Sequence, residues 1–184
     1  MIKVNIIATK KNIFMFVALL LIGAAAHGQF LPTNKISSKP LTIETLNRWI
    51  ETNKVIHDYQ RVIDEMLPTD AEALAFEQLT SVEQDRVVNK YLQQKGMFEP
   101  FNSNMIKLGW TGVADYMRTS TQIGNAIAAY LQADKLARLS PEQASAVLAK
   151  TDPAVKSVSK ADLEFIRVNI NTIRQHILGY ADQK

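Results

Sequence analysis

The stretch LEFIRVNINTIRQHILGY, residues 163–180, decides the fold class of this chain. Its apolar side chains recur at spacings of 3, 4, 3, 4 and 3 residues, which places them on one face of an α-helix. Ser159 stands just before the stretch and can accept hydrogen bonds from the N–H groups of a first helical turn. We therefore expect a long closing helix that packs this face into the core. The face comprises Leu163, Ile166, Ile170, Ile173, Ile177 and Tyr180.

The helical period continues toward the N-terminus as far as Leu41, and no alternating β pattern interrupts it. Capping boxes begin at Thr69, Thr80 and Ser140, each with Glu or Gln three residues later, and Thr42 can cap the first helix. We expect helices over residues 42–67, 71–78, 81–95, 98–108, 111–139, 141–151 and 160–180. Because the helical period runs through this whole range, the sequence predicts an all-α fold. Short connections favour antiparallel neighbours. The predicted architecture is an antiparallel helical bundle of three or four long helices with short intervening helices.

The N-terminus predicts export. Three lysines, Lys3, Lys10 and Lys11, precede an uncharged run of 14 residues that ends in three alanines at Ala26. As a helix this run would span about 21 Å, less than the roughly 30 Å of bilayer hydrocarbon. We therefore expect a signal peptide over residues 1–26, cleaved after Ala26 or Gly28. We expect residues 27–40 to form a flexible lead-in, residues 41–184 to form a single helical domain, and no stable membrane span to remain after cleavage.

Charge and cysteine content exclude several classes of function. The leader holds three of the 21 basic residues and none of the 18 acidic ones, so the chain without it is neutral. A neutral chain with scattered arginines and lysines does not predict a nucleic-acid partner. The absence of cysteine excludes a disulfide, an acylated lipoprotein anchor and a covalent haem attachment. We expect no cofactor, and a periplasmic or extracellular location.

Catalytic and metal-binding motifs are missing from the sequence. His57 and His176 are the histidines of the expected helical domain, and neither has a ligand-type residue four positions away on its helix face. No nucleophile motif or phosphate-binding glycine loop is present. We therefore predict neither a metal site nor catalytic residues, while an enzyme with an unrecognised site stays open as an alternative.

Three aromatic residues are the candidates for binding an unknown protein or small-molecule partner: Trp49, Trp110 and Tyr116. Trp110 stands between two helices, where its ring could plug the end of the bundle or line a shallow groove. Trp49 adjoins the apolar face of the first helix, and Tyr116 faces the core from the long fifth helix. The sequence favours a non-enzymatic binding or accessory protein. It does not define an oligomeric state.

One short element resembles a known family. Leu139-Ser140-Pro141-Glu142-Gln143 is similar to the L-T-x-x-Q element of the small helical periplasmic chaperones of the Spy and CpxP type. The resemblance covers five residues, and Thr45 and Glu83 stand where two further copies would need glutamine. It implies a periplasmic holdase-type chaperone as an alternative function, which would need a broad apolar surface on a concave face.

Overall fold

The structure is a computed structural model that describes residues 39–181, with the side chains at 57, 58, 60, 70 and 178–181 left out. The predicted signal peptide, most of the predicted lead-in and the side chains of His57 and Tyr180 therefore lie outside the described residues. Within the range 39–181 the chain forms helices and no strand, so the predicted all-α class is confirmed. The helices are α2 (Ile43–Val55), α3 (His57–Met66), α4 (Asp70–Glu77), α5 (Ser81–Gln94), α6 (Phe98–Lys107), α7 (Val113–Leu136), α8 (Pro141–Ala149), α9 (Pro153–Lys156) and α10 (Lys160–Ala181).

Most helix ends lie where the capping residues predicted them. Thr42 caps α2, and complete capping boxes open α4 at Thr69, α5 at Thr80 and α8 at Ser140. The Ser159 hydroxyl accepts a hydrogen bond from the backbone N–H of Asp162 at the start of α10, at 3.0 Å. These side chains satisfy N–H groups that have no partner inside the helix, which is why short polar patterns located the boundaries well.

The predicted first long helix is wrong, because the chain bends at Ile56 and forms α2 and α3 instead. Neither proline nor glycine stands at the bend. One turn earlier, the Thr52 hydroxyl donates a hydrogen bond of 2.8 Å to the carbonyl of Arg48, a local bond that commonly bends helices. After the bend, the N–H of Tyr59 bonds to the carbonyl of Ile56 in a tight turn. The apolar spacing continues across the bend, so the sequence pattern could not show it.

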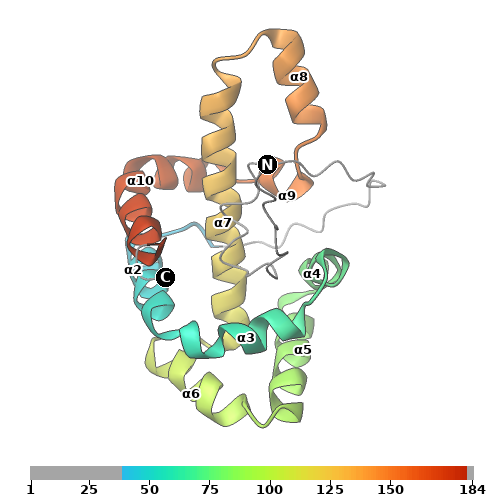
Figure 1. Cartoon of the computed structure of the whole chain (residues 1–184), viewed down its shortest axis with the longest axis vertical. Coiled ribbons are helices and arrows are strands. Elements are labelled where there is room, and N and C mark those ends of the chain that lie inside the picture. Colours follow the sequence, from blue (N-terminus) through green and yellow to red (C-terminus); the bar gives the residue numbers. More distant parts are fainter. Residues whose placement is uncertain (1–38, 182–184) are drawn as a thin grey trace, which may run out of the picture.

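Helix α7 lies at the centre of the fold, in contact with α2, α5, α6, α9 and α10 (Figure 1). Helix α3 runs across the direction of α7 in this view, and the regular antiparallel bundle is not confirmed. The buried apolar side chains form one cluster, with Phe101, Ile123 and Ile166 fully enclosed. On the closing helix α10, Ile166 and Ile173 are fully buried, whereas Ile177 is 36% exposed. The apolar face of α10 is therefore buried most completely at the positions seven residues apart.

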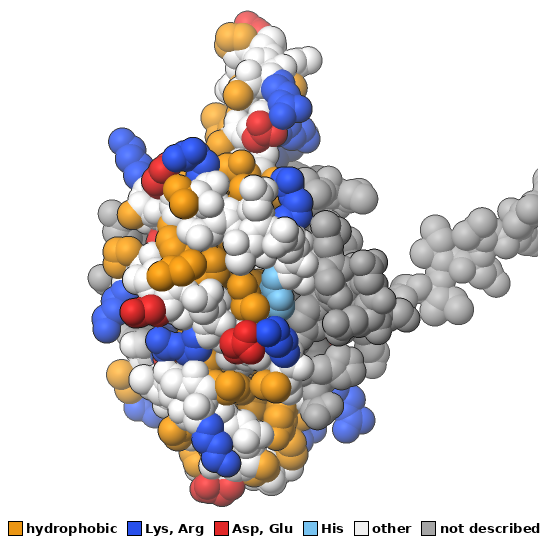
Figure 2. Space-filling view, turned by 90° about the vertical axis from the view of Figure 1, so that its left-hand side faces the viewer, with side chains coloured by type: hydrophobic (Ala, Val, Ile, Leu, Met, Phe, Trp, Pro, Cys, Tyr) orange, Lys and Arg blue, Asp and Glu red, His pale blue; other side chains and the backbone are white. Residues whose placement is uncertain are grey.

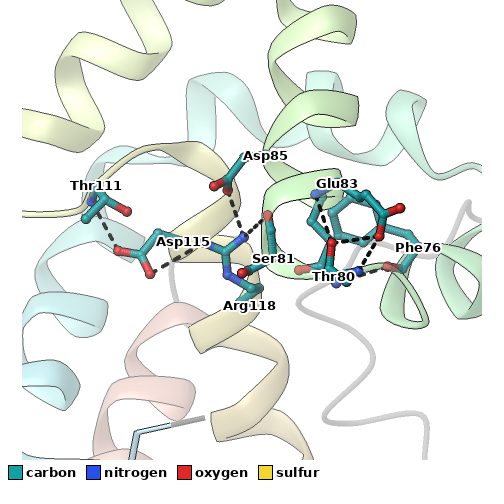
Figure 3. Close-up of polar contacts among 9 residues, drawn as sticks. Phe76, Thr80, Ser81, Glu83, Asp85, Thr111, Asp115 and Arg118 are labelled. Atoms are coloured by element: carbon teal, nitrogen blue, oxygen red, sulfur yellow. Dashed lines mark hydrogen bonds and ion pairs between the residues drawn. The ribbon is translucent and has the colours of Figure 1, made fainter. Parts of the chain in front are cut away.

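Arg118 of α7 joins this central helix to α5 (Figure 3). Its guanidinium donates to the Asp85 carboxylate at 2.8 Å and to the Ser81 carbonyl at 3.3 Å, and Asp115 lies 3.8 Å away. Asp115 also accepts a hydrogen bond from the backbone N–H of Thr111. These contacts fix the start of α5 against the start of α7.

Helix α8 and the C-terminal end of α7 project beyond the other helices (Figures 1 and 2). We call residues 130–149 the arm. No residue of α8 is buried, although Ala144 and Val147 are partly covered. The chain returns to α7 through α9, where Val155 is buried. Across residues 39–181, no helix combines the length and the apolar character that crossing a membrane requires.

Candidate functional site

The three predicted binding residues lie together between α2, α7 and the connection that precedes α7. Trp49, Trp110 and Tyr116 have exposed fractions of 4%, 4% and 3%. The rings of Trp110 and Tyr116 meet edge to face, with centroids 5.6 Å apart. The structure thus brings the predicted residues into one place but buries each of them. Together with Asn53 and His176 they form what we call the aromatic–polar cluster.

Trp110 closes the end of the core next to α2. Its indole N–H donates a hydrogen bond of 2.7 Å to the hydroxyl of Thr52, and the guanidinium of Arg48 lies 4.9 Å from its ring centre. Gly109, with φ at +86°, turns the chain at the end of α6 and directs Trp110 inward. The same guanidinium donates to the carbonyl of Gly109 at 2.7 Å, which ties this turn to α2. Thr52 contacts the N–H group of the indole and Arg48 contacts its ring, so internal contacts account for the burial of Trp110.

Asn53 is the polar centre of the cluster, and it is fully buried. Its side-chain oxygen accepts a hydrogen bond of 2.7 Å from the hydroxyl of Tyr116 on α7. Its side-chain nitrogen lies 3.2 Å from Nε2 of His176 on α10. One amide therefore connects three helices. A buried amide in this position costs free energy unless both of its ends are bonded, and here both are.

His176 lies at the partly buried edge of the cluster. Its ring meets that of Trp49 edge to face, with centroids 5.3 Å apart. The Trp49 indole in turn donates to the hydroxyl of Ser120 on α7 at 3.1 Å. Burial lowers the pKa of His176, Lys54 lowers it further, and Glu51 acts in the opposite direction. The neutral imidazole is therefore the favoured form in the folded protein.

Asn53 and His176 were not among the predicted site residues. The sequence did hold a weak signal, because Thr52 and Asn53 occupy the helix face that continues from Leu46 and Trp49. Two polar residues on a face otherwise suited to burial indicate internal hydrogen bonds. Their partners could not be found in this way, since Tyr116 is 63 residues and His176 is 123 residues away along the chain.

A second feature is a hollow of about 410 Å³ at the base of the arm, between α7 and the start of α10. Tyr130, Ala133 and Leu163 supply its apolar surface. Four charged side chains surround it: Asp134, Lys160, Glu164 and Arg167. We call this feature the arm-base hollow. It is open to solvent, unlike the enclosed pockets that hold most small ligands.

The charges around the arm-base hollow are largely paired with one another or with their own helix. Arg167 makes two hydrogen bonds of 2.7 and 2.6 Å to Glu164, which lowers the pKa of that carboxyl. Asp134 accepts a hydrogen bond of 2.8 Å from Arg138. Among the described residues, no ion pair engages Lys160. The lining of the hollow therefore combines apolar side chains, paired charges and the ammonium group of Lys160.

The two features differ in what they can do chemically. The described hydrogen bonds of the aromatic–polar cluster are internal, and they join α2, α7 and α10. The arm-base hollow faces solvent, and its lining combines apolar and charged side chains, as protein-binding surfaces do. No protein-family model matches the chain, and neither a curated protein nor a solved structure matches it.

Proposed function

We propose that this chain is an exported, non-enzymatic helical-bundle protein that acts by binding a partner protein at the arm and the arm-base hollow. The single observation that carries this proposal is the projecting arm, in which α8 has no buried residue. Full burial of one leucine or valine contributes about 1.5–3 kcal/mol to stability, and α8 forgoes this for Leu148, which is 44% exposed. A binding role explains an exposed helical hairpin of this kind better than a contribution to the stability of the domain does.

The chemistry of the arm-base hollow favours a protein over a small molecule. Small ligands are usually bound in enclosed sites that cover most of their surface, whereas protein partners use open surfaces with an apolar centre and a polar rim. Tyr130 belongs to a residue type that commonly anchors protein interfaces. The position of Tyr130 beside Leu163 gives a partner side chain two apolar neighbours at once.

The distribution of exposed apolar residues favours a docked partner over the holdase alternative. The described residues include nine large apolar side chains that are exposed, and these lie on six helices. A holdase would gather them on one concave face. The exposed residues are Ile43, Val55, Leu74, Val82, Val87, Ile106, Leu148, Val168 and Ile177.

A pair of matched leucines tests the proposed docking site. Leu148 on the arm and Leu74 on α4 are exposed by 44% and 56%, so the same change at either costs little stability. A photo-reactive amino acid placed at 148 in living cells should cross-link to a specific protein, whereas one placed at 74 should not. Leu148→Lys should then weaken binding of that protein by about tenfold or more, and Leu74→Lys should leave it unchanged.

The melting temperature of both lysine variants controls for unfolding. Equal cross-linking at 148 and 74, or equal affinity of the two lysine variants for the cross-linked protein, would contradict the proposed surface. The export part of the proposal is tested separately, by N-terminal sequencing of the protein outside the cytoplasm. A chain that still begins at Met1 would exclude cleavage of the leader.

A further inference from the structure

Among the described side chains in the last turns of α10, His176 makes the contacts with α2. Beyond the fully buried Ile173, the side chains of Arg174, Gln175 and Ile177 are exposed, and among the described side chains of this segment only His176 is partly buried. Its ring packs on Trp49 and its Nε2 lies 3.2 Å from the amide nitrogen of Asn53. The described contacts of this segment with α2 therefore involve a titratable ring.

The hydrogen bonds of Asn53 determine which form of the ring can bind. Because the amide oxygen of Asn53 accepts from the hydroxyl of Tyr116, the amide nitrogen faces His176 and donates. Nε2 must then act as an acceptor, which requires a neutral imidazole with its proton on Nδ1. A protonated ring would direct an N–H group at the NH₂ group of Asn53, and this contact would become repulsive.

Reorientation of the Asn53 amide would not restore the network. If the amide turned over, its oxygen would face the imidazolium and its nitrogen would face the hydroxyl of Tyr116. That hydroxyl would then lose the buried acceptor to which it now donates at 2.7 Å. The loss of a buried partner is costly, so protonation of His176 weakens the cluster with either orientation of the amide.

We propose that His176 is a pH-sensitive latch, which in its neutral form fastens the last turns of α10 to α2 through Asn53 and Trp49 and which releases them when it is protonated. Among the described residues, the charged groups that act on the ring are Lys54 and Glu51, both on α2. They form an ion pair of 2.6 Å with each other, so their effects on the ring partly offset. From α7 the described titratable side chain nearest to this site is Tyr116, whose hydroxyl donates to Asn53.

The direction of the pH effect follows from the ring's environment. Burial lowers the pKa of His176 below its ordinary value of 6.5 in the folded protein. The attachment is therefore complete above pH 6.5 and is lost as the pH falls through the lower folded pKa. Between these two pKa values, each unit by which the pH falls should increase the open population of the segment by up to about tenfold.

Hydrogen–deuterium exchange of the exported protein between pH 8 and pH 5 tests this latch. After correction for the intrinsic pH dependence of exchange, residues 174–181 should open increasingly as the pH falls, while residues 160–170 should not. His176→Gln keeps a side chain that can accept from Asn53 but cannot titrate, so the pH dependence should disappear. Gln175→Ala, at an exposed position on the same turn, is the control and should retain it.

A second variant and a direct titration guard against a merely structural effect. Asn53→Asp places a carboxylate beside the ring, which should raise the pKa of His176. Because this carboxylate can accept a hydrogen bond from the protonated ring, protonation no longer breaks the contact. The opening should therefore shift to lower pH or disappear. NMR titration of His176 in the parent protein should give a pKa below 6.5 that coincides with the midpoint of the opening. Opening that is independent of pH in the parent, or that persists unchanged in His176→Gln, would overturn the latch.

Discussion

Replacement of Trp110 by phenylalanine should destabilise the domain by about 2–3 kcal/mol. The change removes the hydrogen bond of 2.7 Å from the indole to Thr52, whose net contribution between two buried groups is about 1 kcal/mol. It also leaves part of the volume of the larger ring empty at a site that is 4% exposed, which costs about another 1–2 kcal/mol. A phenyl ring can still meet Tyr116 and Arg48, so these contacts are weakened but not lost.

A double-mutant cycle isolates the hydrogen bond from the loss of volume. Thr52→Val keeps the branched shape of the side chain and removes the hydroxyl that accepts from Trp110. Urea unfolding followed by circular dichroism at pH 7.5 should give a coupling energy of about 1 kcal/mol between the two changes. The Trp110→Phe variant should also melt about 4–12 °C below the parent. A coupling energy near zero, or a parental melting temperature for Trp110→Phe, would refute the assignment of Trp110 as an internally bonded core residue.

Three further predictions concern buried positions elsewhere. Asp162→Ala should lower the free energy of unfolding by about 2–4 kcal/mol, because this carboxylate is 4% exposed and accepts hydrogen bonds of 2.8 Å from the backbone N–H of Leu41 and 3.1 Å from the side-chain amide of Gln122. Urea unfolding measures this loss, with Asp134→Ala as the exposed control. Ile173→Ala should cost about 2–5 kcal/mol and Ile177→Ala less than half as much, since the first side chain is fully buried and the second is 36% exposed; equal losses in thermal melts would contradict the packing of α10. Burial, with the charge of Asp152 nearby, raises the pKa of Glu77 to about 7, so its contribution to stability is full below pH 4.5 and is lost as the pH rises through 7. Glu77→Gln should therefore be more stable than the parent at pH 8 but not at pH 4, and an equal difference at both values would exclude the shift.

The helix boundaries could be predicted from the sequence because they depend on neighbouring residues. A capping box needs only a threonine or serine and a glutamate or glutamine three positions later, and the boxes at Thr69, Thr80 and Ser140 all formed. The period of the closing helix likewise located the fully buried Ile166 and Ile173. Such signals act over one or two helical turns, and they do not depend on which residues pack against the helix.

The bend at Ile56 and the arrangement of the candidate site were beyond such signals. The apolar spacing runs through the bend unchanged, so the direction of α3 follows from packing against the other helices and from the local bond of Thr52. The predicted aromatic residues did converge, but a sequence pattern does not state whether a tryptophan at a corner faces solvent or the core. The hydrogen bond from Trp110 to Thr52 joins residues 58 positions apart.

The sequence by itself determined that the chain is helical, where most of its helices begin, and which face of the closing helix turns inward, because these properties follow from hydrogen bonding and hydrophobic period within a single helix. Tertiary structure alone decided that Asn53 links Tyr116 to His176, that α8 stands away from the core, and that a hollow opens between α7 and α10. The physical reason is that a side chain is buried, bonded or exposed according to the surface that packs against it, and that surface comes from residues far away in the sequence.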